Sequence, residues 1–220
     1  MPLPPADEVH LWALDLTRPP GEVGGLLPSA DLRRADQLGP RWAVARASLR
    51  ALLGRYLGVE PQSLGFRERG KPRLDPASPL RFNLSHSGDV ALVAVASERE
   101  VGVDVEAVDR ARDAERLSRR VLLASERAAV AESGDAALAF HRHWVAKEAY
   151  VKATGRGLSS LRSFELSLDG PEGPRLLHVG GDAAEAGRWS VRMLDVAPPY
   201  VAALVFEGDA RVTPLAVFDP

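Results

Sequence analysis

The sequence predicts an α+β protein with two pseudo-symmetric lobes, each made of helices packed on a small, mainly antiparallel sheet. The main observation is that helix-forming segments are followed by strand-forming segments twice along the 220 residues. In addition, two apolar runs, at residues 90–95 and 200–205, occupy matching places in the two halves. We expect the first lobe to span residues 1–105 and the second to span residues 106–220.

In the first half, the clearest element is a helix at residues 41–57. Its apolar side chains recur at helical spacing, and Gly58 stands where a glycine commonly ends a helix. Ser29 has the residue type of an N-cap for an earlier helix, with Asp31 in the first turn of that helix. Strands are expected at residues 10–16, 80–84, 90–96 and 101–105.

The second half repeats this order. Residues 109–120 carry charges of both signs and are expected to form a solvated connector or helix. Ser125 and Glu126 open a short helix, and residues 135–154 form a long helix that Gly155 ends. Strands are expected at residues 164–168, 176–179, 189–194 and 200–206.

The composition excludes several classes of site. Lys and Arg number 28 and Asp and Glu number 30, so the net charge of −2 creates no general attraction to nucleic acid or to an anionic membrane. The absence of cysteine excludes disulfides, a thiol nucleophile and cysteine-based metal sites. No apolar run reaches the ~18 residues of a membrane span, and the N-terminus lacks the pattern of a signal peptide, so we expect a cytoplasmic protein.

Two acidic residues belong to the strand expected near residues 101–105. Because side chains alternate along a strand, Asp104 and Glu106 share one face, and Val103 and Val105 share the other. Neighbouring carboxylates repel each other unless a cation lies between them, and Mg²⁺ prefers carboxylate oxygens. The alternative is a strand end whose polar face lies in water.

A second set of charges lies on the long helix expected at residues 135–154. Trp144, Glu148 and Lys152 are four residues apart and therefore share one face of the helix. Glu148 could supply a third carboxylate to a metal, and Lys152 could supply a positive charge to a phosphate. The alternative is an ordinary surface pair of Glu and Lys.

The segment Phe82–Asp89 concentrates polar groups between two expected strands. Ser85 and His86 carry groups that can donate to a phosphate, but His86 is equally suited to a structural role in a turn. Lys71 stands between a glycine and a proline, so it is either a cation held on a rigid turn or an ordinary solvated lysine. A hydrolase is not indicated, because the chain lacks a Gly-x-Ser-x-Gly elbow.

Two histidines of the long second-half helix are expected at the surface. His141 and His143 are two residues apart on a helix, so they face different directions and do not form a metal-binding pair. Arg41, Arg46 and Arg50 are expected on the side of their helix that lies opposite its apolar side chains.

Taken together, these segments resemble the 4′-phosphopantetheinyl transferases of the two-lobed, surfactin-synthetase-activating (Sfp) branch. The family signatures are Gly-(Val/Ile)-Asp-x-Glu and Trp-x-x-Lys-Glu-Ala-x-x-Lys-x-x-Gly-x-Gly-Leu. They stand here at residues 102–106 and 144–158. Residues 70–72 and 82–89 match two further family segments in the family order, and residues 27–57 match more loosely.

The resemblance implies a reaction. Coenzyme A gives its phosphopantetheine arm to a serine of an apo acyl, aryl or peptidyl carrier protein, adenosine 3′,5′-bisphosphate leaves, and Mg²⁺, or Mn²⁺ in its place, is required. Such carriers serve fatty-acid, polyketide and nonribosomal-peptide synthesis. The resemblance also implies an active site at the lobe interface and a monomeric enzyme, with no nucleic-acid or membrane partner.

The resemblance assigns roles to individual residues as well. The metal would be held by Asp104, Glu106 and Glu148. Glu148, directly or through a metal-bound water, would take the serine proton, and Lys152 would neutralise a diphosphate oxygen of coenzyme A. Val105 cannot ligate, so water is expected to complete the metal shell. The 3′-phosphate of coenzyme A would be held by Ser85, His86, Lys71 and Arg34, with Arg46 as a weaker candidate.

Two other functions stay open at this point. The same carboxylates could serve a different Mg²⁺-dependent enzyme that cleaves a pyrophosphate in coenzyme A or in a nucleotide. A module that only docks carrier proteins would lack the acids, and none is missing. A basic stretch at Arg116, Arg119 and Arg120 could meet an acidic carrier helix, although a solvated charged helix is the competing interpretation.

Overall fold

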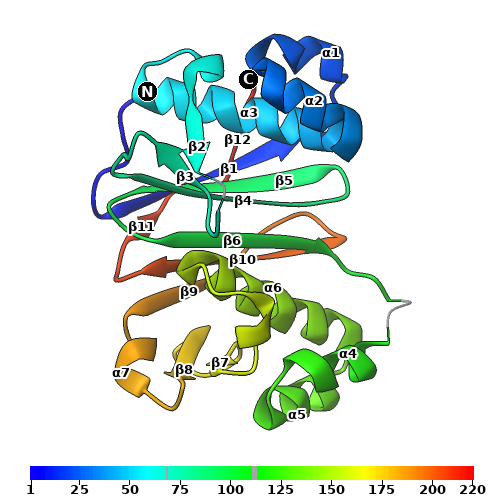
Figure 1. Cartoon of the computed structure of the whole chain (residues 1–220). Coiled ribbons are helices and arrows are strands. Elements are labelled where there is room, and N and C mark those ends of the chain that lie inside the picture. Colours follow the sequence, from blue (N-terminus) through cyan, green and yellow to red (C-terminus); the bar gives the residue numbers. More distant parts are fainter. Residues whose placement is uncertain (68, 111–112) are drawn as a thin grey trace. The chain divides into compact units, whose positions relative to one another are not determined.

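The chain forms two compact units, one made of Met1–Glu98 together with Ala210–Pro220 and the other of Arg99–Asp209. This division differs from the boundary expected after residue 105. The strand Val101–Ala107 pairs inside the second unit, and the end of the chain returns to pair with the first strand. The computed structural model, drawn in Figure 1, describes residues 1–67, 69–110 and 113–220.

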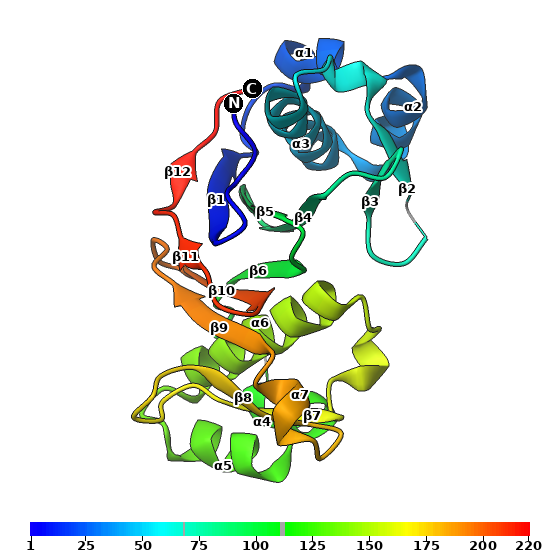
Figure 2. The same ribbon diagram turned by 90° about the vertical axis from the view of Figure 1, so that its left-hand side faces the viewer.

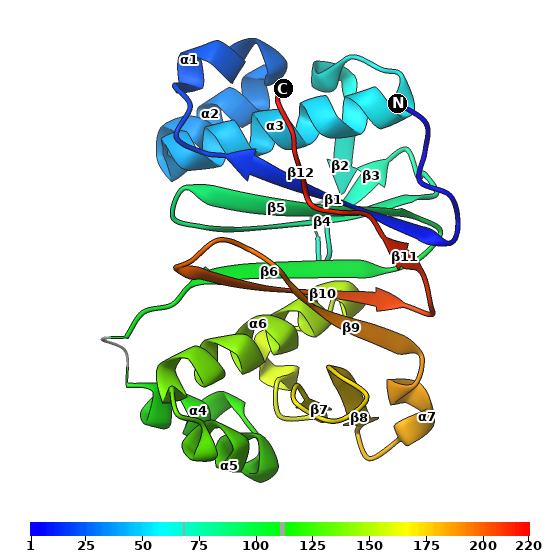
Figure 3. The ribbon, with the colours of Figure 1, turned by 180° about the vertical axis from the view of Figure 1, so that it is seen from behind.

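The first unit is built on a five-stranded sheet made of β1 (Glu8–Asp15), β4 (Leu80–Ser87), β5 (Val90–Ser97), β11 (Arg211–Val212) and β12 (Ala216–Val217). The strand order is β11-β1-β5-β4, and β12 also pairs with β1. The β1–β5 and β4–β5 pairs are antiparallel, whereas the two short C-terminal strands run parallel to β1 (Figure 3). The expectation of a mainly antiparallel sheet is therefore confirmed.

Three helices cover one face of this sheet: α1 (Pro20–Val23), α2 (Ser29–Leu38) and α3 (Pro40–Leu57) (Figure 2). The long helix α3 was expected from its apolar spacing, and Gly58 ends it with a positive φ of 66°. Helix α2 begins at Ser29 itself, after Pro28. The remaining short elements are the 3₁₀ turns Gly24–Leu26 and Pro61–Ser63 and the hairpin β2 (Gly65–Arg67) and β3 (Arg73–Asp75).

The second unit is built on a three-stranded antiparallel sheet in the order β6 (Val101–Ala107), β10 (Tyr200–Glu207) and β9 (Trp189–Leu194). A separate hairpin is formed by β7 (Phe164–Ser167) and β8 (Arg175–Val179). These strands lie where the sequence predicts them. They confirm that the second half, like the first, combines helices with a small antiparallel sheet.

The helices of the second unit are α4 (Ala114–Val121), α5 (Ala124–Glu132), α6 (Ala136–Thr154) and the short α7 (Ala183–Ala186), with a 3₁₀ turn at Leu158–Ser160. Helix α6 lies along β6 and β10, and its apolar residues form the centre of this unit's core (Figure 1). Within the described ranges, no helix combines the length and the apolar character needed to cross a membrane.

Candidate active site

Strand β6 and helix α6 approach each other very closely at Gly102. A Cβ atom added there would lie 2.1 Å from the carbonyl oxygen of Ala149 and 2.4 Å from the backbone nitrogen of Ala153. Real side chains do not tolerate such distances, so the strand passes under the helix backbone only because residue 102 is glycine. The small residues at 102, 149 and 153 thus allow the backbones of the two elements to pack directly against each other at this point.

The acids of β6 lie on the same face of the strand as Gly102, because they follow it at even spacing. Asp104 is only 3% exposed, and its Oδ1 accepts a hydrogen bond of 2.6 Å from Nζ of Lys152 on α6. Val103 and Val105 lie on the opposite face and are fully buried. The expected alternation is therefore confirmed, with the carboxylates turned toward the helix.

Glu148 of α6 belongs to the same group. Burial raises the pKa of its carboxyl group, the negative charges of Asp104 and then Glu106 raise the pKa further, and the positive charge of Lys152 opposes them. Charges act in this way only over short distances, so the three acids and the lysine share one local environment. We call Asp104, Glu106, Glu148 and Lys152 the acid cluster.

The three carboxylates of the acid cluster offer the oxygen ligands that a hard divalent cation prefers, and they come from a strand and a facing helix. As the side chains stand, however, no group of three or more acid or histidine residues in the described part of the chain is arranged as a ready ligand set. Lys152 holds Asp104 instead. A cation would therefore have to compete with the lysine for the Asp104 carboxylate.

A fully buried ion pair lies on another side of α6. Nζ of Lys147 is 2.7 and 2.9 Å from the two carboxylate oxygens of Glu126 and 3.0 Å from the carbonyl oxygen of Phe164. The Glu126 carboxylate also accepts hydrogen bonds from the backbone N–H groups of Leu123 and Leu166. The pair was missed at the sequence level, because Lys147 stands directly beside another charged residue, Glu148, and nothing in the spacing marks it as buried. It ties α6 to α5 and β7, one residue before Glu148.

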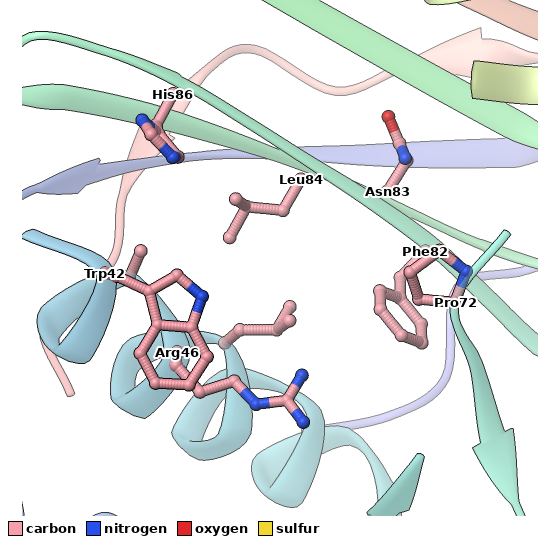
Figure 4. A pocket seen from close by; sticks show the side chains of 9 residues that line it. Trp42, Arg46, Pro72, Phe82, Asn83, Leu84 and His86 are labelled. Carbon is pink, nitrogen blue, oxygen red and sulfur yellow. The ribbon is translucent and has the colours of Figure 1, made fainter. Parts of the chain in front are cut away.

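The first unit contains a cavity of about 280 Å³ between α3, β4 and the loop that joins β2 to β3 (Figure 4). We call it the α3–β4 pocket. Figure 4 shows Trp42 and Arg46 projecting from α3 and His86 projecting from β4 around it. The lining residues are Trp42, Ala45, Arg46, Leu49, Pro72, Phe82, Asn83, Leu84 and His86.

The α3–β4 pocket contains two of the five residues that were expected to hold a phosphate, Arg46 and His86. Ser85, Lys71 and Arg34 are described but do not line it. Ser85 is buried and, being adjacent to His86 on a strand, lies on the opposite face of β4.

Lys71 precedes the pocket residue Pro72, and the guanidinium of Arg34 lies 5.3 Å from the ring centre of Trp42. Both are therefore near the pocket without lining it. Trp42 was missed at the sequence level, and its only signal is an aromatic residue on the arginine-bearing side of α3.

The turn expected at residues 85–89 is shorter than predicted. Strand β4 continues to Ser87, and the chain reverses at Gly88, whose φ is 56°. The reason is that Ser85, His86 and Ser87 pair with β5 in register.

The arginines of α3 do not all face solvent. Arg50 is 4% exposed, and its Nε donates to Asp31 of α2 over 2.7 Å. Arg50 is buried although it was expected on the side of α3 opposite the apolar side chains, because Asp31 supplies a buried counter-charge. Arg46 donates to the same carboxylate, and Arg41 pairs with Asp89 at the surface.

The prediction that His141 and His143 lie at the surface is wrong. They are 1% and 3% exposed, and the Nδ1 atom of each bonds to a backbone carbonyl four residues earlier in α6, over 2.7 and 2.9 Å. Burial lowers the pKa of His143, which therefore favours the neutral form. The two histidines do face different directions, but both of those sides of α6 are covered by other parts of the protein.

Known proteins resemble this chain along most of its length. A family model described as the 4′-phosphopantetheinyl transferase superfamily matches residues 100–205, which include the acid cluster. The chain is 37% identical over 228 residues to the 4′-phosphopantetheinyl transferase HetI of Nostoc sp. (strain PCC 7120), a match that covers 94% of this chain and 93% of that protein. It is 39% identical over 150 residues to the 4′-phosphopantetheinyl transferase AcpT of Salmonella typhi, with 66% of this chain and 74% of that protein covered. The chain belongs to the 4′-phosphopantetheinyl transferase superfamily.

Proposed function

We propose that the protein moves the 4′-phosphopantetheine arm of coenzyme A onto a serine of an apo acyl, aryl or peptidyl carrier protein, with the help of Mg²⁺, and that adenosine 3′,5′-bisphosphate leaves. Family membership supports the transfer to a carrier protein. The observation that carries the finer proposal is the acid cluster, in which two strand carboxylates act electrostatically on Glu148 above them.

Asp104, Glu106 and Glu148 would hold the divalent ion. When bound, the ion supplies positive charge to the diphosphate oxygens, where negative charge develops as the serine oxygen bonds to the β-phosphorus and the bond to the leaving bisphosphate breaks. Val105 lies on the opposite face of β6 and supplies no ligand.

Glu148 suits the role of general base for the serine proton. Its environment raises the pKa of its carboxyl group, mainly through burial, and a carboxylate with a raised pKa accepts a proton more readily. Lys152 would contact a diphosphate oxygen, because its side chain is 27% exposed and its ammonium already lies in the acid cluster.

The α3–β4 pocket suits the adenosine end of coenzyme A. Arg46 and His86 can donate to the 3′-phosphate, and the ring of Trp42 offers an apolar wall to the base. The acid cluster and this pocket belong to different units of the chain. The expectation that the active site lies where the two lobes meet stays a prediction.

The test is to incubate the protein with coenzyme A and Mg²⁺, with and without an apo carrier, and to measure adenosine 3′,5′-bisphosphate. We expect release only when the carrier is present, in a one-to-one ratio with the modified serine, and none after chelation of the metal. Equal release without a carrier would instead support a pyrophosphate-cleaving enzyme and contradict the proposal.

A further inference from the structure

Asp31, in the first turn of α2, is buried, and its carboxylate accepts hydrogen bonds from two arginines. Only 4% of the residue is exposed, and its Oδ2 accepts from Nε of Arg46 over 2.8 Å and from Nε of Arg50 over 2.7 Å. Burial by itself raises the pKa of Asp31, but the hydrogen bonds from Arg46 and Arg50 outweigh it, so the pKa stays below its usual value. The carboxylate is therefore ionised at neutral pH.

Both guanidinium groups lie over the ring of Phe66, with the Arg46 carbon 4.2 Å and the Arg50 carbon 5.0 Å from the ring centre, but their other contacts differ. Arg50 is buried, and its second donor group bonds to the carbonyl oxygens of Pro61 and Leu64, each over 2.9 Å. It therefore belongs to the framework that holds α2, α3 and the following loop together. Arg46 lies one turn earlier on α3 and lines the α3–β4 pocket.

An aromatic ring holds the other side of the Arg46 guanidinium. The guanidinium carbon lies 4.2 Å from the ring centre of Phe66 on β2, which places the planar group over the ring face. Phe66 in turn makes an edge-to-face contact with Phe82, at 5.8 Å and 81°, and Phe82 lines the pocket. Asp31 and Phe66 thus contact the Nε atom and one face of the Arg46 guanidinium without lining the pocket themselves.

We propose that Asp31 is a positioning residue that, together with the Phe66 ring, fixes the guanidinium of Arg46 at the α3–β4 pocket so that it binds the 3′-phosphate of coenzyme A. The inference rests on the proposed function. Its physical basis is pre-organisation: a long side chain already held in its bound orientation loses little conformational freedom when the ligand arrives.

The inference can be tested because charge and position predict opposite results. Asp31 carries a negative charge close to the pocket, so a purely electrostatic account predicts that the substitution Asp31→Asn strengthens the binding of an anionic ligand. The positioning account predicts weaker binding, because the asparagine amide cannot hold Arg46 with a charge-assisted hydrogen bond. The sign of the change therefore decides between them.

The experiment is titration calorimetry on the full-length protein with adenosine 3′,5′-bisphosphate and, separately, with adenosine 5′-monophosphate, which lacks the 3′-phosphate. For Asp31→Asn we expect the bisphosphate affinity to fall about tenfold, equivalent to about 1.4 kcal/mol, and the monophosphate affinity to stay within about twofold. The matched control is Asp36→Asn, which removes the same charge from an exposed position on the same helix and should change neither affinity.

Unchanged or tighter bisphosphate binding by Asp31→Asn would overturn the inference, and so would an equal loss for both ligands. If this variant does not fold, Phe66→Leu decides. It keeps every charge and removes the ring from Arg46, and also from Arg50, whose guanidinium carbon lies 5.0 Å from the ring centre. Phe66→Leu should weaken bisphosphate binding selectively, and unchanged binding would overturn the inference. A wild-type protein that binds neither nucleotide would contradict the proposed function itself, and that outcome is distinct from a change of the wrong sign in the variants.

Discussion

Glu148 is the residue on which the proposed chemistry depends most. The substitution Glu148→Gln keeps the shape of the side chain and removes both its charge and its ability to accept a proton. Removal of a general base typically costs about 10²–10⁴-fold in rate, so we expect at least a 100-fold slower appearance of holo-carrier in a single-turnover assay.

The control for this variant is Glu132→Gln, which removes an exposed acid from α5 in the same unit. Its rate should equal that of the wild type. A Glu148→Gln protein that melts normally and transfers at the wild-type rate would remove Glu148 from the mechanism.

The buried His143 should make the free energy of unfolding depend on pH. Burial lowers its pKa below 6.5, with the charge of Lys147 acting in the same direction and those of Glu126 and Asp169 opposing it. The unfolded chain therefore takes up a proton more readily than the folded one as the pH falls below about 6.5, so this histidine contributes stability above that pH and loses it below. Urea unfolding between pH 7.5 and pH 5.5 should show a smaller loss of stability for His143→Gln than for the wild type. Identical pH slopes would contradict the assignment.

The sequence reveals residue positions that depend on local structure. It does not reveal positions that depend on partners far away in the chain. Asp104 and Glu106 could be placed on one face because strand alternation is a local property. The burial of Arg50 and Lys147 depends on Asp31 and Glu126, which lie 19 and 21 residues away in the chain. The spacing of residues along one helix gives no information about a counter-charge so far away in the sequence.

At the scale of elements, Gly102 controls the distance between β6 and α6. We expect Gly102→Ala to lower the free energy of unfolding by about 3 kcal/mol, because the new Cβ meets backbone atoms that cannot move aside independently. Transfer activity should fall as well, since the helix that carries Glu148 would shift. The measurement is denaturant unfolding with Gly134→Ala as the matched control, because nothing lies within 4 Å of a Cβ at that position. Equal stability of the two variants would show that the close approach is not needed.

The pair of Lys147 and Glu126 fixes α6 against its other neighbours. Because both side chains are fully buried, removal of one partner leaves an uncompensated charge, and Lys147→Met should cost about 3–5 kcal/mol. The double variant with Glu126→Gln should recover much of that loss, since neither charge is then buried. A double-mutant cycle by thermal unfolding measures the coupling, and additive losses would mean that the two groups do not act as a pair.

Long elements were predictable, and the ends of elements were less so. Helices α3 and α6 follow from apolar spacing over about five turns each, and a glycine with positive φ ends both. The extension of β4 through Ser87 depends on its pairing with β5, which is a long-range property. The two-residue strands β11 and β12 are too short to show an alternating pattern of apolar and polar residues. They form because they pair with the edge of β1.

For the whole molecule, the division into two α+β units follows from the repeated order of helices and strands, but their boundary does not. The boundary expected after residue 105 puts most of strand β6 in the first half, and its pairing with β10 places it in the second unit. The acid cluster is therefore contained in one unit. A family model that covers residues 100–205 alone agrees with that division.

The most direct measurement is intact-mass spectrometry of a panel of apo carrier proteins incubated with this protein and coenzyme A, with Mg²⁺ or with a chelator. The account predicts that at least one carrier gains the mass of one phosphopantetheine group when the metal is present and gains nothing when it is chelated. Full modification in the chelated samples would contradict the role given to Asp104, Glu106 and Glu148. A panel in which no carrier gains mass would contradict the transfer itself.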